Sequence, residues 1–139
     1  MSEDPELKFC DLTFRSAVMD SLTANIAVLD PKGDVVAVNE RWQEFAAANH
    51  MHNSDIGVGT NYLAVCRSAK ADPNARAALE GILEVMKGQS SYFYHEYPCH
   101  SSDVQRWFAL RATPLVDYPN FVVVSHEDIT ERISATRSD

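Results

Sequence analysis

The segment FVVVSHEDITERISA, residues 121–135, is the most informative stretch of the chain. Residues 121–126 are mostly aromatic or β-branched, which predicts a strand. Residues 128–135 are polar and begin with an aspartate, which predicts the start of a helix. Because no glycine or proline separates the two parts, we expect the last strand of a sheet to continue directly into a helix.

This C-terminal helix has a start signal and one apolar edge. Asp128 can cap the helix, and Glu131 three residues later forms a pair of the capping-box kind. Ile129 and Ile133 are four residues apart and therefore lie on one helical face. That face is suited to packing against a partner helix.

Four more strands precede this segment. The sequence NIAVLDPKGDVVAVN, residues 25–39, predicts a hairpin with a type I turn at Asp30-Pro31-Lys32-Gly33. Residues 90–99 and 106–115 predict two more strands, joined by short linkers into an antiparallel meander with the last one. A two-stranded hairpin is marginally stable alone, so both groups are expected to close one five-stranded antiparallel sheet.

The remaining segments predict helices. One helix starts near Thr13, another follows the cap residue Asn39, and a short one covers residues 61–69. A longer helix has sharp limits, with Asp72 at its N-cap and Gly88 just past its end. The order of helix, two strands, several helices, three strands and helix indicates an α+β fold with helices on one face of the sheet.

Composition excludes several classes of function. The chain has 139 residues, 45% of them hydrophobic, and a net charge of −8. It has no cluster of Lys and Arg for a nucleic acid backbone, and an acidic surface suits anionic lipid poorly. We find no signal peptide and no apolar run near the ~20 residues that span a bilayer. These features predict one cytoplasmic domain with neither nucleic acid nor membrane as a partner.

The order of the elements resembles a PAS domain, the sensory module common in bacterial signalling proteins. The segments that carry the resemblance are NIAVLDPKGDVVAVN (25–39), NERWQEFAAAN (39–49), GTNYLAVCRSA (59–69), EYPCHSSDVQRWFALRATPL (96–115) and HEDIT (126–130). The resemblance implies a flexible acidic N-terminus at 1–12, a sensor domain at 13–128 and the start of an output helix at 129–139.

The resemblance also implies a signal relay. PAS domains typically end in an Asp-Ile-Thr turn that joins the last strand to the output helix, and Asp128, Ile129 and Thr130 match it. The implied partner is an effector, such as a histidine kinase of a two-component system or a cyclic-dinucleotide enzyme.

A ligand pocket is implied between the inner face of the sheet and the middle helices. In the flavin-binding branch of the family, the residue two before the aspartate of the exit turn faces the ligand, and His126 holds that position here. The candidate lining residues are Trp42, Phe45, Tyr62, Cys66, Leu79, Phe108, Val124 and His126. The alternative is that these side chains simply fill the core of a ligand-free interaction scaffold, with His126 a neutral histidine bonded to a backbone carbonyl.

Flavin and heme both match the sequence poorly. The flavin-adduct branch needs a cysteine directly after an asparagine, whereas Tyr62 follows Asn61 and Cys66 lies a turn later. Heme sensors of this fold take a histidine from the long helix before the third strand, and residues 73–88 contain none. The identity of a cofactor therefore stays unknown.

Neither a metal site nor catalysis is indicated. His95, Cys99 and His100 are close in sequence, but an exposed turn with incidental polar residues explains them more simply than a metal site. The chain contains no nucleophile-elbow, zinc-protease or Walker motif. We therefore expect a protein that is not an enzyme.

The N-terminal helix indicates that two copies of the chain form a dimer. Phe14, Val18 and Leu22 repeat at helical spacing with no strand assigned to cover them, and Phe121 and Val123 are expected on the outer face of the sheet. PAS-like modules commonly dimerise through this helix and this face, which implies a parallel homodimer with Phe14, Val18 and Leu22 near the partner.

Overall fold

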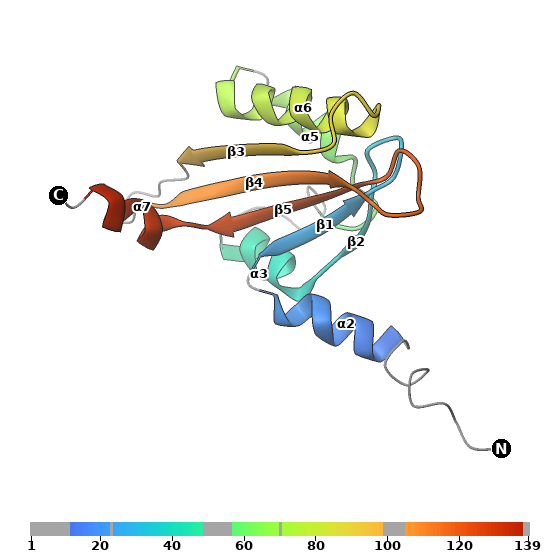
Figure 1. Ribbon diagram of the computed structural model, residues 1–139, viewed down its shortest axis with the longest axis horizontal. Helices are drawn as coiled ribbons and strands as arrows, with labels where there is room; N and C mark the ends of the chain where they lie inside the picture. The colour runs from blue at the N-terminus through green and yellow to red at the C-terminus, as the bar shows by residue number, and fades with distance from the viewer. Residues whose placement is uncertain (1–11, 23, 49–56, 70, 99–104, 138–139) are drawn as a thin grey trace.

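A computed structural model describes residues 12–22, 24–48, 57–69, 71–98 and 105–137, without the side chains at 12, 15–16, 19–20, 45–48 and 134–137. In chain order the elements are α2 (Leu12–Ser21), β1 (Asn25–Leu29), β2 (Val35–Val38), α3 (Glu40–Ala48), α5 (Tyr62–Ser68), α6 (Pro73–Met86), β3 (Phe93–Pro98), β4 (Trp107–Pro114), β5 (Val122–Asp128) and α7 (Thr130–Arg137) (Figure 1). The acidic N-terminus predicted at 1–12 lies almost wholly outside the described residues.

The five strands form one antiparallel sheet, as predicted. Their order is β2-β1-β5-β4-β3. The last strand in sequence, β5, is therefore central and pairs with β1 on one side and with β4 on the other. A central strand is hydrogen-bonded along both edges. The whole sheet therefore fixes the position of the end of β5, from which the chain continues into α7.

Helices α3, α5 and α6 cover one face of the sheet, which confirms the predicted layering. Trp42 of α3, Leu63 of α5 and Ile82 of α6 are buried in one core together with Val122 and Val124 of β5. The core thus lies between the three helices and the inner face of β5, where the sequence placed the candidate pocket.

Two local signals place α3 against the sheet. The turn before β2 closes with a hydrogen bond from the Gly33 amide to the Asp30 carbonyl, and Gly33 has a φ of +91°. After β2, the Asn39 side chain accepts hydrogen bonds from the Trp42 amide at 3.0 Å and from the Ile26 amide at 2.9 Å. Asn39 therefore caps α3 and ties its first turn to β1, which fixes the position of the Trp42 indole.

Helix α6 approaches β3 closely at Gly81. A β-carbon at Gly81 would collide with the ring of Phe93. The helix begins after Asp72, whose side chain accepts a hydrogen bond from the Asn74 amide, and it has proline at its start. The predicted cap is confirmed, and the glycine allows the helix to lie directly on the edge strand of the sheet.

Two predicted boundaries need correction. Strand β5 begins at Val122, so Phe121 belongs to the preceding loop, where its ring packs edge-on against Tyr118 at a centroid distance of 5.6 Å. Helix α7 begins at Thr130, because Asp128 is still paired with Phe108 as the last residue of β5. The strand is therefore longer, and the helix starts later, than the polar character of Glu127 and Asp128 predicts.

Helices α2 and α7 lie apart from the helical layer (Figure 1). Figure 1 shows α2 extending away from the sheet toward the N-terminus, and α7 following the end of β5 at the far side of the molecule. Phe14 and Val18 of α2, and Leu22 directly after its end, are 41%, 47% and 45% exposed. Within the described residues, no helix is both long enough and apolar enough to span a bilayer.

Candidate functional site

His126 lies on the inner face of the central strand. It shares that face with the buried Val122 and Val124, as strand alternation predicted, and is itself only 7% exposed. Its neighbours across the sheet are Leu110 of β4 and Asn25 of β1. The side chain thus points into the core beneath the helices, and it must find its hydrogen-bond partners there.

Two tyrosine hydroxyls meet the two imidazole nitrogens. The Tyr62 hydroxyl lies 3.0 Å from Nε2, and the Tyr97 hydroxyl lies 2.7 Å from Nδ1. A neutral imidazole has one donor and one acceptor, so one tyrosine donates its proton to the ring while the other accepts the ring proton. The partners are phenols on α5 and β3, whereas the ligand-free alternative gave His126 a backbone carbonyl as its partner.

Aromatic rings enclose this hydrogen-bonded group. The Trp42 ring centroid is 5.4 Å from that of His126 and 5.9 Å from that of Tyr62. Tyr97 meets His126 edge-on at 5.9 Å and stacks on Phe108 at 6.0 Å. We call Trp42, Tyr62, Tyr97 and His126 the His126 cluster. It joins α3, α5 and β3 to the central strand.

The His126 cluster carries no charge at neutral pH. Burial lowers the pKa of His126 to about 4, which keeps the imidazole neutral. Burial, followed by the nearby Cys66 and Tyr97, raises the pKa of Tyr62 well above its usual value. Burial also raises the pKa of Cys66 to about 11, so its thiol stays protonated and is a poor nucleophile.

The structure brings together part of the predicted pocket lining. Trp42 and Tyr62 contact the His126 ring. The other candidates described are buried or half-buried on the same inner side: Cys66, Phe108 and Val124 are buried, and Leu79 packs against the core from α6. The side chain of Phe45 lies outside the described residues.

Tyr97 is the site residue that the sequence did not single out. It lies within the strand predicted at residues 90–99 and is absent from the candidate lining residues. Alternation along residues 93–98 places Tyr97 on the same face as Phe93 and His95, and the observed burial pattern follows that alternation. Tyr97 pairs with Phe108 of β4, which pairs in turn with Asp128 of β5. This register brings Tyr97 near His126, and the residue pattern alone does not predict it.

The exit turn is fastened to the start of β4. The Ile129 amide donates to the Trp107 carbonyl at 2.8 Å, and the Trp107 amide donates to the Thr130 hydroxyl at 3.0 Å. Asp128 accepts hydrogen bonds from both the amide and the hydroxyl of Thr130, at 2.9 and 2.6 Å. All three predicted relay residues therefore take part in one bonded turn, and a cleft of about 410 Å³ lined by residues 127–132 borders it.

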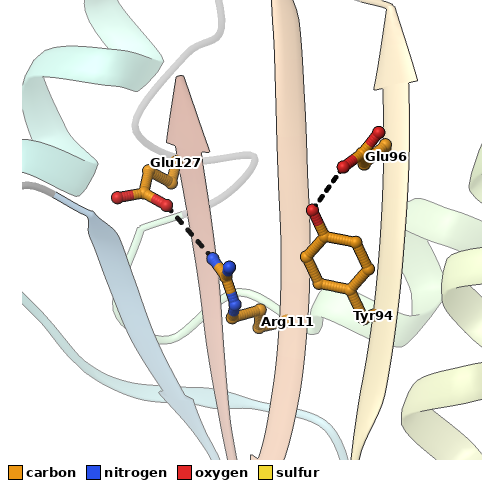
Figure 2. Close-up of polar contacts among 4 residues, drawn as sticks. All are labelled: Tyr94, Glu96, Arg111 and Glu127. Atoms are coloured by element: carbon orange, nitrogen blue, oxygen red, sulfur yellow. Dashed lines mark hydrogen bonds and ion pairs between the residues drawn. The ribbon is translucent and has the colours of Figure 1, made fainter. Parts of the chain in front are cut away.

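On the outer face of the sheet, side-chain contacts with β4 and β3 also hold the C-terminal end of β5 in place (Figure 2). Glu127 forms an ion pair with Arg111 at 3.1 Å, and the Arg111 guanidinium lies 4.9 Å from the centre of the Tyr94 ring. Tyr94 in turn donates a hydrogen bond to Glu96. Because this ion pair is about one-third exposed, its contribution is modest, on the order of 0.2–1 kcal/mol.

Nothing in the described residues forms a metal site. No group of three or more His, Cys, Asp or Glu side chains that could hold a metal ion occurs among them. His95 is instead hydrogen-bonded to the Asn74 side chain at 2.9 Å. Cys99 and His100, which were considered with it, lie outside the part of the chain that the structure describes.

Comparison with known proteins bears on the fold. Residues 19–134 match a family model described as PAS fold. The chain is 40% identical over 124 residues to a Rhodobacter capsulatus protein described as "Uncharacterized 104.1 kDa protein in hypE 3'region"; the match covers 86% of this chain and 13% of that protein. The chain thus spans a small part of the length of this relative.

Solved structures give the same result at lower identity. The PAS domain of Bordetella pertussis BvgS is 18% identical, with a TM-score of 0.59 over 91% of this chain and 92% of that one. The PAS domain of the Cronobacter turicensis RpfR quorum-sensing receptor, in complex with C12:0, is 19% identical, with a TM-score of 0.53 over 79% of this chain and 97% of that one. At these identities the likeness shows the fold.

Proposed function

Because the chain belongs to the PAS-fold family, we propose that it is a cytoplasmic sensory module without catalysis of its own. It binds a small molecule at the His126 cluster and relays the event through the exit turn and α7 to an effector. The observation that carries this proposal is the position of His126, which is on the central strand two residues before Asp128. A change at the buried ring therefore reaches the exit turn along a single strand.

The hydrogen bonds of β5 support such a relay. His126 is bonded on the inner side to α5 and β3, and the next residue, Glu127, is bonded on the outer side to β4. The turn that follows is bonded to Trp107. Displacing either tyrosine would change the forces on β5 directly before its last contact with the sheet, where α7 begins.

The comparisons support a sensory role of this kind. A PAS domain with similar fold belongs to a quorum-sensing receptor and was solved with C12:0 bound. The similar segment of the Rhodobacter capsulatus protein is 13% of its length, so a segment like this one occurs within a much longer chain. A histidine kinase or a cyclic-dinucleotide enzyme is the effector class that we propose.

The ligand part of the proposal can be tested on gently purified protein. We expect native mass spectrometry to show the chain with a noncovalent small-molecule adduct that denaturation removes. We also expect no flavin or heme absorbance, since Cys66 is displaced from the flavin-adduct position and residues 73–88 contain no histidine to bind heme iron. A visible band at one chromophore per chain would contradict the second expectation, and a bare chain mass would favour the alternative below.

The alternative is a ligand-free dimerisation scaffold. Two observations favour it: both ring nitrogens of His126 are hydrogen-bonded by tyrosines of the cluster, and no buried side-chain nitrogen or oxygen in the described residues lacks a partner. The exposed apolar residues of α2 and its end are the corresponding interaction surface, since Phe14, Val18 and the following Leu22 are all more than 40% exposed. Scaffold and sensor both use a dimer, so dimerisation is expected in either case.

We expect the chain to form a parallel homodimer through α2, with the two α7 helices side by side. Val18→Asp should shift light scattering at tens of micromolar from two chains to one, because a charge buried in an apolar interface costs several kcal/mol. Val116→Asp is the matched control, since Val116 is 79% exposed in the loop before β5. A wild-type mass of one chain, or a Val18→Asp variant that stays fully dimeric, would contradict this interface.

A further inference from the structure

The two tyrosines of the His126 cluster differ in how firmly they are held. Tyr62 is 7% exposed, its amide is bonded to the Gly33 carbonyl at 2.8 Å, and its ring packs on Trp42. Tyr97 is only half-buried and lies on β3, which is at the edge of the sheet. A side chain on an edge strand with part of its surface in solvent moves at lower cost than one enclosed by the core.

The bond that Tyr97 makes is one that another molecule could make. Its hydroxyl lies 2.7 Å from Nδ1 of His126. A hydroxyl can both donate and accept, so it matches either tautomer of the imidazole. A ligand that replaces it without leaving Nδ1 unpaired must offer the same ability, because an unpaired buried nitrogen is costly.

The rings that the structure describes around His126 do not favour charged ligands. The side chains in ring contact with His126 in the described residues are Trp42, Tyr62 and Tyr97, all of them uncharged. The ion pair on the same stretch of β5, Arg111 with Glu127, belongs to the opposite face of the sheet. A carboxylate or ammonium group brought to this position would lose its water without gaining a counter-charge from these rings.

We propose that Tyr97 is the displaceable partner of His126 and that the ligand is an uncharged hydroxyl compound with an apolar body, which takes the place of the Tyr97 hydroxyl at Nδ1. This inference rests on the sensory role proposed above and names the chemistry of its ligand. Trp42 lies beside His126 and Phe108 lies beside Tyr97. These aromatic rings suit a planar body, and the imidazole supplies the polar contact that orients it.

Three small probes of the same shape test the chemistry. p-Cresol carries a neutral hydroxyl, toluene has no hydrogen-bonding group, and p-toluate is an anion at pH 7. They are titrated by calorimetry into wild type, into Tyr97→Ala, which vacates the ring, and into Tyr94→Ala. Tyr94 precedes Tyr97 by three residues on β3 but lies on the outer face, so its removal is the matched control.

We expect p-cresol to bind Tyr97→Ala at least about tenfold more tightly than it binds wild type or Tyr94→Ala, because no ring has to be displaced. In Tyr97→Ala, p-cresol should bind about fivefold more tightly than toluene, through one hydrogen bond, and p-toluate should be the weakest of the three. The nitrogen resonances of the His126 ring should return toward their wild-type values with p-cresol but not with toluene.

Equal binding of toluene, or tighter binding of p-toluate, would overturn the proposed ligand chemistry. Identical affinities in Tyr97→Ala and Tyr94→Ala would overturn the role of Tyr97. If Tyr97→Ala does not fold, Tyr97→Phe keeps the ring and removes only the hydroxyl, and p-cresol should still bind it more tightly than it binds wild type. None of these results depends on α7, whose response tests the sensory role separately.

Discussion

Trp42→Ala is expected to lower the free energy of unfolding by about 3–5 kcal/mol, since it leaves a large cavity in the core. The Trp42 ring is 1% exposed and contacts both Tyr62 and His126. Its position is set by Asn39, which binds the Trp42 amide and the first strand together. The substitution should therefore weaken the junction of α3 and α5 with the sheet. Urea denaturation monitored by circular dichroism measures the change.

The neighbouring exposed residue provides the control for this effect. Gln43→Ala, one position along the same helix, should change stability by less than about 0.5 kcal/mol, as surface substitutions usually do. A similar small change for Trp42→Ala would mean that the indole contributes little to the core, and the account of how α3 joins the His126 cluster would be wrong.

Acidification between pH 6.5 and 4 is expected to destabilise the fold by about 3 kcal/mol through His126. Burial lowers the pKa of this histidine from 6.5 to about 4. Over that interval the unfolded chain binds the proton that the folded chain excludes, so stability falls as the pH falls. Each pH unit of this interval corresponds to about 1.4 kcal/mol. Well above pH 6.5 the histidine is neutral in both the folded and the unfolded chain, so this destabilisation is absent.

A variant that cannot titrate isolates this contribution. His126→Gln keeps a hydrogen-bonding side chain between Tyr62 and Tyr97, so its unfolding free energy, whatever its absolute value, should lose most of the slope that wild type shows between pH 6.5 and 4. Denaturant titrations at half-unit pH intervals give both slopes. If wild type and His126→Gln showed the same slope, the imidazole would not be buried in its neutral form.

Much of the fold was predictable because local signals agreed with one another. Asp72 and Gly33 mark a helix start and a turn for reasons that involve only the backbone beside them, and both are found where predicted. The PAS resemblance implied that His126 and Val124 face the pocket, and both lie buried on the inner face of the last strand. The predicted start of the C-terminal helix at Asp128 was wrong, because a strand end that faces solvent can also carry polar residues.

The candidate site was predictable only as a set of residues on the correct face. Its hydrogen bonds join residues 29 and 64 positions apart, Tyr97 and Tyr62 with His126. Such contacts depend on strand register and on how α5 lies over the sheet, and a single sequence specifies neither. The Arg111–Glu127 ion pair was missed for the same reason, since it joins β4 to β5 on the outer face.

The relay from the His126 cluster to α7 is the central claim, and amide hydrogen exchange at the exit turn tests it most directly. Tyr62→Phe removes one bond to His126 in the core, whereas Tyr118→Phe removes a hydroxyl from a ring that is 57% exposed in a loop. The Ile129 amide, bonded to Trp107, reports on the exit turn. We predict that Tyr62→Phe accelerates Ile129 exchange about fivefold, equivalent to one hydrogen bond of coupling, while Tyr118→Phe leaves it unchanged. Unchanged Ile129 exchange in Tyr62→Phe, with faster exchange confined to α5, would contradict the relay.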